Sequence, residues 1–345
     1  MAEIMETFMG REDIEKTAAR IPHAEKLCGR AVLLTGATGL IGSAVAEILF
    51  FLNAKKNAGI RIYLAGRSEE RMRKRFPQGG YRFVSYDALD EKIDIEEADF
   101  IIHAASPADP ASYVKEPVET MLANLRGLHT FLQWAKGKST RILYVSSSEV
   151  YGKKSGSEPY AETDYGFVDD LNPRSCYPMA KRAAETLCAS YRKEYGTDFV
   201  IARPGHVYGP EMTETDSRAS AQFARNALTG EDIVMKSAGM QLRSYCYSLD
   251  CASAILTILT DGAAGEAYNI SNAASVVRIR DVAEAFAKAG GKKIVFENPS
   301  DEEAAGYNMM DNSSLNAEKL EALGWKAEYD LEAGVAKTIE ILRGL

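Results

Sequence analysis

Residues 33–44, LLTGATGLIGSA, carry three glycines in a GxxGxxG spacing between a strand-like apolar run and a helix-like segment. Glycine lets the backbone turn tightly and approach a pyrophosphate, which then lies on the helix N-terminus where free N–H groups favour anions. This strand–turn–helix context is the one that the motif requires, and it favours a dinucleotide site over a purely structural turn. The residues expected at this site are Gly36, Thr38, Gly39, Leu40, Ile41 and Gly42.

The sequence around this turn alternates short apolar runs with longer helical segments. AVLLTG, IRIYLAG, ADFIIHAA and TRILYVSS have the continuous apolar character of buried strands, and SAVAEILFFLNAKKN and VETMLANLRGLHTFLQWAK are typical of helices. Because parallel strands are joined by crossover helices, the alternation predicts an α/β fold. We expect a Rossmann-type, doubly wound parallel sheet with helices on both faces.

The pattern predicts three parts in the chain. Residues 1–28 form a helical N-terminal extension, for which packing on the main domain is favoured over a dimer contact or a lid. Residues 29–204 form the dinucleotide-binding domain, and part of 231–260 returns to it. Residues 205–345 form mainly a smaller, interwoven α/β lobe that binds the substrate.

The composition narrows the class of function. The 345 residues carry a net charge of −8 and no basic stripe, which argues against a nucleic-acid surface. The five cysteines form no CxxC pair and no zinc-like cluster with histidine, so we expect reduced thiols and no metal. The most apolar stretch, AVAEILFFL, is about half the length of a membrane span. The N-terminus is acidic where a signal peptide is basic. These features predict a cytoplasmic protein that enters no membrane.

The end of the second predicted strand bears on the choice of coenzyme. A dinucleotide site usually has an acidic residue there, which binds the adenosine ribose hydroxyls, but this sequence has Gly66 followed by Arg67. A guanidinium at this place suits a 2′-phosphate and favours NADP over NAD; the alternative is a solvated residue at a helix start. The other residues expected along the coenzyme, from SYDALD and IIHAASPADP, are Asp87, Ala88, Ala104, Ala105 and Ser106.

A tyrosine and a lysine four residues apart lie in SCYPMAKRAAE. Tyr177 and Lys181 share one face of the predicted helix, where an ammonium beside a phenol lowers the pKa of the tyrosine. The preceding strand ends in VSSSEVYG, residues 145–152, and its serines leave the core where parallel strands form their ligand crevice. We expect one serine hydroxyl there to hydrogen-bond both the substrate and the tyrosine.

With these motifs the sequence resembles the extended short-chain dehydrogenases/reductases of the NAD-dependent epimerase/dehydratase family, which act on nucleotide sugars. The resemblance covers nearly all of residues 30–340. It rests, in order, on TGATGLIG, IIHAASP, ANLRG, VSSSEVYG, YPMAK, ARPGHVYGP and QLRSYCYSLD. It implies a tightly bound NAD or NADP, hydride transfer at the sugar C4, and a homodimer formed through the helices after ANLRG and around YPMAK.

The resemblance also implies roles for individual residues. Ser147 supplies the catalytic hydroxyl, Tyr177 acts as base or acid, and Lys181 holds the nicotinamide ribose and tunes Tyr177. The further coenzyme residues that it implies are Asn124, Pro204 and Val207. The substrate residues that it implies are His206, Arg218, Gln241 and Arg243.

The pair Ser148-Glu149 distinguishes reactions within that family. Dehydratases of the deoxythymidine-diphosphate-glucose type carry Asp-Glu there, whereas Ser-Glu resembles UDP-glucuronate decarboxylases. Arg243, in QLRSY, matches the arginine that such decarboxylases place near the substrate carboxylate and phosphates. We therefore expect a decarboxylase-like enzyme with Ser148, Glu149 and Arg243 in catalytic roles. The alternatives are a nucleotide-sugar 4-epimerase or 4,6-dehydratase, and a non-catalytic NAD(P)-binding sensor or scaffold. Three places depart from the family pattern. His206 replaces an asparagine, Glu211 replaces an arginine, and NMMDNSSL lacks the basic residue that usually precedes Asp311.

Overall fold

The N-terminal extension packs on the main domain. The computed structural model describes residues 12–344 apart from Glu91, Asp109, Glu214 and Met309, so residues 1–11 of the predicted extension lie outside it. The first described elements are α2 (Glu12–Ala19) and the 3₁₀ turn η1 (Ala24–Leu27), and α2 packs against α3 (Leu40–Lys56) and α9 (Ser248–Asp261). Ile14 and Ala18 of α2 are buried in this contact.

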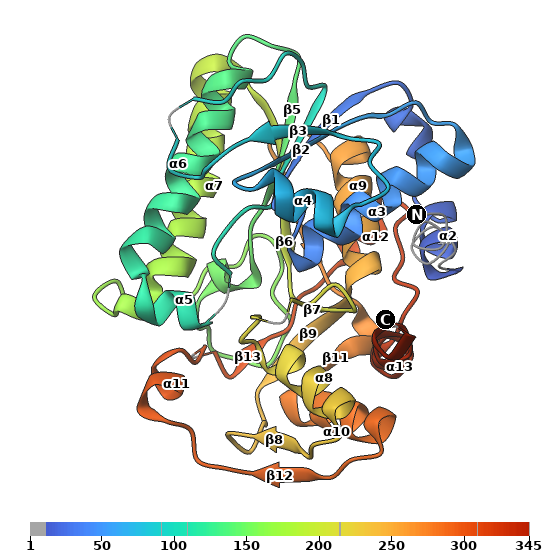
Figure 1. The fold of residues 1–345 in the computed structure, drawn as a ribbon. Coiled ribbons are helices and arrows are strands. Elements are labelled where there is room, and N and C mark those ends of the chain that lie inside the picture. The colour runs from blue at the N-terminus through green and yellow to red at the C-terminus, as the bar shows by residue number, and fades with distance from the viewer. Residues whose placement is uncertain (1–11, 91, 109, 214, 309, 345) are drawn as a thin grey trace.

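Seven strands form a large sheet (Figure 1). In spatial order they are β10 (Ala267–Ile270), β6 (Asp198–Pro204), β5 (Arg141–Val145), β4 (Phe100–His103), β1 (Ala31–Thr35), β2 (Arg61–Gly66) and β3 (Arg82–Ser85). Every pairing is parallel. The chain runs outward from β1 through β2 to β3 and then returns to β4 on the other side of β1. The strand order therefore reverses between β1 and β4, which is where doubly wound sheets bind ligands.

Helices cover both faces of this sheet, with α6 and α7 on one side and α3 and α9 on the other (Figure 1). The remaining helices of this domain are α4 (Glu69–Arg75), α5 (Pro110–Lys115), α6 (Pro117–Ala135), α7 (Cys176–Tyr195), η2 (Ser148–Tyr151) and η3 (Pro173–Ser175). Successive strand side chains point to opposite faces. Val32 and Leu34 of β1 accordingly join the core under α3 and α9, whereas Leu33 joins the core under α6 and α7. This double burial explains why the strands are continuous apolar runs.

The smaller lobe contains short strands and helices. Its strands are β7 (His206–Tyr208), β8 (Ile233–Met235), β9 (Leu242–Tyr247), β11 (Val276–Arg278), β12 (Ile294–Phe296) and β13 (Asn312–Ser313). β9 pairs with β7, β11 and β13, and β8 pairs with β12. The helices are α8 (Ala219–Thr229), η4 (Ala273–Ser275), α10 (Ile279–Gly290), α11 (Asp301–Ala305), α12 (Glu318–Glu321) and α13 (Leu331–Gly344).

The chain returns from the smaller lobe to the large sheet through residues 248–270. α9 packs against α3, β5 and β6, and β10 adds a strand beside β6. The sequence predicts that part of 231–260 returns to the large domain, and α9 makes this return, whereas β8 and β9 belong to the sheets of the smaller lobe. β9 is as buried as a strand of the large sheet. The sheet to which β9 belongs is therefore decided by the strands with which it pairs, and the local sequence does not reveal these partners.

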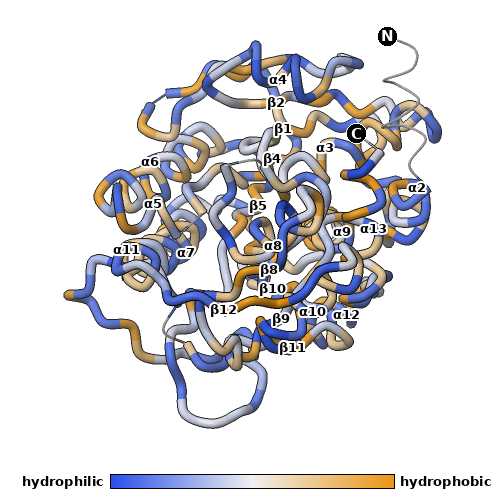
Figure 2. Tube along the Cα trace, turned by 60° about the horizontal axis from the view of Figure 1, so that its bottom comes forward, coloured by the Kyte–Doolittle hydropathy of each residue, from blue (hydrophilic) through white to orange (hydrophobic). Residues whose placement is uncertain are grey.

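The predicted fold class, a Rossmann-type parallel sheet covered by helices on both sides, is confirmed. In Figure 2 hydrophobic segments run through the middle of the molecule, beside α9 and β10. Among the described residues, no helix combines the length and the apolar content that crossing a lipid bilayer requires.

Candidate active site

A cavity of about 470 Å³ lies at the carboxyl ends of the central strands. The turns after β4, β5 and β6 form its walls on the side of the large sheet, and β8, β9 and α11 of the smaller lobe contribute the opposite wall. The cavity therefore lies between the two lobes and beside the switch point of the sheet. Ser147, Ser148, Glu149, Tyr177 and Lys181 all line it.

The three serines that follow β5 have different surroundings. Ser146 is buried and donates a hydrogen bond of 2.6 Å to the carboxylate of Glu185 on α7. Ser147 caps the η2 turn, because its Oγ accepts from the backbone N–H of Glu149 at 3.2 Å. Its hydroxyl also acts on the Tyr177 phenol, whose pKa it lowers. Ser147 is thus the serine that meets the tyrosine.

Tyr177 and Lys181 lie one turn apart on α7 and are both buried. The Lys181 Nζ donates to the backbone carbonyl of Val145 at 2.8 Å, which anchors the ammonium under the serine turn. It lies 5.6 Å from the centre of the Tyr177 ring. The phenol, the serine hydroxyl and the amine therefore converge on one side of the cavity, as the motifs predict.

Burial dominates the ionisation of this pair. The sequence predicts that the Lys181 ammonium lowers the pKa of Tyr177, but in the folded protein burial raises the pKa of Tyr177 to about 12. The charge of Glu149 adds to this rise, while hydrogen bonds from Ser147 and Tyr113 and the charge of Arg218 lower the pKa. Burial also lowers the pKa of Lys181 to about 7. Removing both groups from water disfavours the charged form of each, which the helical spacing alone does not show.

Two further residues of the site escaped the sequence analysis. The Tyr113 ring, from α5, stacks on the Tyr177 ring with 4.6 Å between their centres. The Arg174 guanidinium, from η3, lies 4.6 Å from the centre of the Tyr113 ring on which it packs. Arg174 also forms a fork with the Glu149 carboxylate, with N–O distances of 3.0 and 2.9 Å. Arg174 stands three residues before Tyr177, but nothing in the local pattern singles out Tyr113.

The arginines among the described residues that line the cavity differ in their partners. Arg174 holds Glu149, and Arg218 holds the carboxylate of Asp216. Arg243, only 2% exposed, donates instead to the backbone carbonyls of Leu242 and Asp311, at 2.9 and 3.5 Å. Within the described part of the chain no carboxylate lies at ion-pair distance from it.

Other predicted substrate residues present unpaired polar atoms. His206 Nδ1 and Gln241 Oε1 are buried, line the cavity, and have no hydrogen-bond partner among the described residues. Burial and the nearby charges of Arg243 and Arg218 lower the pKa of His206 to about 3, so the ring is neutral at pH 7. Glu211 is not part of the cavity wall; it is buried and accepts a hydrogen bond from Ser248.

The glycine turn joins β1 to α3 at the edge of the site. Gly36 has a φ of 70°, and a Cβ there would lie 2.8 Å from the carbonyl carbon of Ala104. Only glycine fits this contact, so the turn lies directly against the loop after β4. Of the residues predicted in this turn, Ile41 lines the cavity, and Gly39 is the N-cap of α3. The remaining members, along the same turn and first helical turn, are Thr38, Leu40 and Gly42.

The other predicted coenzyme residues, apart from Asn124 on α6, lie at or after the carboxyl ends of strands on both sides of this turn. Ala104, Ser106, Pro204 and Val207 line the cavity. The backbone N–H groups of Ala104 and Ala105 donate to Thr35, and Asn124 accepts a hydrogen bond of 2.9 Å from Ser106, so both contacts fix the loop after β4. Arg67, exposed after β2, and Asp87 and Ala88, after β3, lie outside the cavity wall.

Comparison with known proteins agrees with this geometry. Residues 32–271 match the model of the NAD dependent epimerase/dehydratase family. The chain is 31% identical to UDP-glucuronic acid decarboxylase 3 of Arabidopsis thaliana over 308 residues, covering 88% of this chain and 86% of the relative. It is 28% identical to UDP-glucuronic acid decarboxylase 1 of Xenopus tropicalis, covering 91% and 72%.

A solved structure is similar over a comparable length. The UDP-glucose 4-epimerase of Thermus thermophilus, in complex with NAD, superimposes with a TM-score of 0.74 at 25% identity. The alignment covers 91% of this chain and 99% of the epimerase. By the family model and the identity to its relatives, the chain belongs to the NAD-dependent epimerase/dehydratase family of nucleotide-sugar modifying enzymes.

Proposed function

We propose that this enzyme is a UDP-glucuronate decarboxylase, which converts its substrate into a UDP-pentose and CO₂. The observation that carries the proposal is Arg243, a buried arginine in the cavity wall whose guanidinium has no carboxylate partner among the described residues. A buried cation without an acid is costly, and an anionic ligand would supply the missing charge. The named relatives and the Ser148-Glu149 pair support a substrate that bears a carboxylate.

The residues that face the cavity fit a nicotinamide dinucleotide. The tight Gly36 turn leaves the α3 N-terminus free for a pyrophosphate, and the buried Lys181 ammonium suits a ribose hydroxyl. We propose that Ile41, Ser106 and Val207 contact the coenzyme from the cavity wall. When bound, the coenzyme supplies the acceptor and the donor of a hydride. Arg67 after β2 supports NADP over NAD, because no acidic residue occupies that position.

The chain's own residues then move one proton and orient one leaving group. Tyr177 takes the C4 hydroxyl proton as the C4 hydride leaves, and Ser147, Tyr113 and Arg218 are the groups that favour its phenolate. The resulting 4-keto acid is a β-keto carboxylate, so its C5–C6 bond breaks with the electron pair entering the carbonyl and CO₂ leaving. Arg243 holds the anionic part of the substrate. After C5 gains a proton from water, the hydride returns to C4 and Tyr177 returns its proton.

The reaction can be tested directly on purified protein. Incubation with UDP-glucuronate should release CO₂ and UDP-pentose in equal amounts. Arg243→Gln should lower kcat/KM by about 100-fold or more, because an ion pair with the substrate is lost. Arg280→Gln, which removes an exposed arginine paired with Glu284, is the matched control and should leave kcat/KM unchanged. Epimerised or dehydrated sugar without CO₂ would replace the proposal with those reactions. No product from any nucleotide sugar would favour a sensor or scaffold.

We also propose a homodimer that forms through α6 and α7. These two helices lie side by side on one face of the sheet (Figure 1), and Val118 and Met121 of α6 are apolar yet 61% and 37% exposed. Burying such side chains against a second copy is favourable. Light scattering should give twice the mass of the chain, and a monomer at micromolar concentration would reject the proposal.

A further inference from the structure

A buried ion pair lies directly behind the serine turn. Glu185 on α7 and Arg203 on β6 form a fork, in which Arg203 Nε and Nη2 donate to the two carboxylate oxygens at 3.0 and 2.6 Å. The Arg203 and Glu185 side chains are only 5% and 12% exposed. Neither residue lines the cavity, so neither contacts a substrate there.

The Glu185 carboxylate lies beside the serine turn, on the same helix as Tyr177 and Lys181. Ser146, the neighbour of Ser147, donates to Glu185 at 2.6 Å and fixes the serine turn to α7. Glu185 also lies one helical turn after Lys181, and it is the acidic group whose charge acts on the Lys181 ammonium. The ammonium itself is tied to the Val145 carbonyl, one residue before Ser146.

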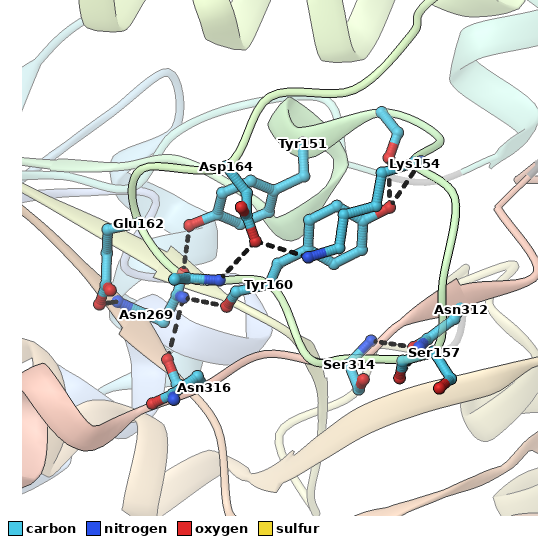
Figure 3. A network of polar contacts seen from close by, with 12 residues as sticks. Tyr151, Lys154, Ser157, Tyr160, Glu162, Asp164, Asn269, Asn312, Ser314 and Asn316 are labelled. Atoms are coloured by element: carbon cyan, nitrogen blue, oxygen red, sulfur yellow. Dashed lines mark hydrogen bonds and ion pairs between the residues drawn. The ribbon is translucent and has the colours of Figure 1, made fainter.

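The Arg203 guanidinium is also held by a network of hydrogen bonds that joins the two lobes. Arg203 Nη1 donates to the Tyr151 hydroxyl at 3.0 Å, and that hydroxyl donates to Asn269 Oδ1 at 2.5 Å. Asn269 Nδ2 in turn donates to the carbonyls of Tyr160 and Asn316, at 2.8 and 3.0 Å (Figure 3). The ring of Tyr151 stacks on that of Tyr160. The fork is therefore held in one orientation by both lobes.

We propose that Glu185 and Arg203 are positioning residues, which orient the Ser146–Ser147 turn and supply the negative charge that the buried Lys181 ammonium requires. The proposal rests on the proposed function for its catalytic consequence, but not for the effect of the Glu185 charge on Lys181. Arg203 fixes the position of the Glu185 carboxylate, because two charge-assisted hydrogen bonds hold the planar fork.

Few groups act on the Lys181 ammonium. Glu185 and Tyr177 lie on its own helix, the Tyr144 ring of β5 lies 4.8 Å from Nζ, and His103 of β4 interacts with its charge. Burial lowers the pKa of His103 to about 3, so the ring is neutral, and burial likewise raises the pKa of Tyr144 and Tyr177. Among the described residues, Glu185 is thus the acidic group whose charge acts on Lys181.

The test measures the titration of Lys181 itself, in protein containing carbon-13-labelled lysine. The Lys181 signal is assigned by its absence in Lys181→Arg. Glu185→Gln should lower the pKa of Lys181 below the wild-type value by about one unit, a tenfold change in proton affinity. Glu47→Gln is the matched control, since it removes another buried carboxylate, on α3, that pairs with an arginine, Arg75. It should leave the Lys181 titration unchanged.

Folding and function are separated by two further measurements. If Glu185→Gln does not fold with Arg203 unpaired, the double variant Glu185→Gln, Arg203→Gln removes both charges and should show the same fall in the pKa of Lys181. A Lys181 titration that does not move in either folded variant would overturn the inference. A wild-type protein that forms no CO₂ from UDP-glucuronate, but whose Lys181 titration moves in Glu185→Gln, would reject the proposed reaction and retain the inference.

Discussion

The Arg174 guanidinium holds both carboxylate oxygens of Glu149 and at the same time donates from Nε to the Gly306 carbonyl at 3.0 Å. One side chain thereby joins the serine turn to the segment of the smaller lobe that closes the cavity. The same guanidinium packs on Tyr113, which stacks on Tyr177. Arg174 therefore links the smaller lobe, the serine turn and, through the Tyr113 ring, the catalytic tyrosine.

Replacing Arg174 should impair catalysis through Glu149. The charge of Glu149 raises the pKa of Tyr177, and the paired guanidinium offsets that charge. In Arg174→Gln the carboxylate is left unpaired, so the pKa of Tyr177 rises further. We expect kcat/KM at neutral pH to fall by about 10- to 100-fold, with the limb on which activity rises with pH moved to higher pH. Arg141→Gln is the control. It breaks a similar half-buried pair with Asp198 at the amino ends of β5 and β6, away from the cavity, and should leave the pH dependence of kcat/KM unchanged. An unmoved profile in Arg174→Gln would contradict this role.

Removing the phenolic hydroxyl should separate chemistry from binding. Tyr177→Phe keeps the ring that stacks on Tyr113 but removes the proton acceptor. We expect kcat to fall by at least about 1,000-fold, while coenzyme affinity changes by less than about threefold. Rapid-quench product analysis and coenzyme titration measure the two quantities. Tyr208→Phe, which alters a buried tyrosine hydrogen-bonded to the Leu331 carbonyl, is the control and should retain kcat. Substantial turnover by Tyr177→Phe would remove Tyr177 from the mechanism.

The choice between NADP and NAD should depend on Arg67. This exposed residue follows β2, the position at which dinucleotide sites bind the adenosine ribose or its 2′-phosphate. Arg67→Ala should weaken NADP binding by about tenfold and leave NAD binding unchanged. Calorimetric titration of both coenzymes provides the comparison, and Arg73→Ala serves as the control because Arg73 is engaged with Glu69. If the ratio of the two affinities stays the same, Arg67 is only a solvated residue at the start of α4.

The sequence and the structure agree where local pattern determines position. The glycine turn, the serine turn and the Tyr177–Lys181 pair each follow from a short motif, and the parallel sheet brings their strand ends to one edge. Tyr113 was not predictable, because its role comes from the way that α5 packs on α7. The pKa of Lys181 was not predictable either, since it depends on burial by the whole domain. Local motifs thus locate the chemistry, and tertiary packing sets its electrostatics.

The histidines of the core should make the folded protein sensitive to acid. Burial lowers the pKa of His103 and of His206 from 6.5 to about 3, and the positive charges of Lys181, Arg243 and Arg218 add to this. Below pH 6.5 the unfolded chain takes up protons on these rings that the folded protein does not bind. The free energy of unfolding therefore falls as the pH falls from 6.5 toward 3, by about 1.4 kcal/mol per pH unit for each histidine.

His206→Asn, which restores the residue of the family pattern, should remove one of these two contributions. Between about pH 7 and pH 5, the variant should lose about 2 kcal/mol less of its unfolding free energy than the wild type. Burial raises the pKa of Asp250 to about 7, which acts with the opposite sign over this range but equally in both proteins, so it cancels in the difference. Urea denaturation at the two pH values measures the effect. His129→Asn alters an exposed histidine and should behave as the wild type. Equal pH dependence in His206→Asn and the wild type would show that His206 gains its proton while the protein stays folded.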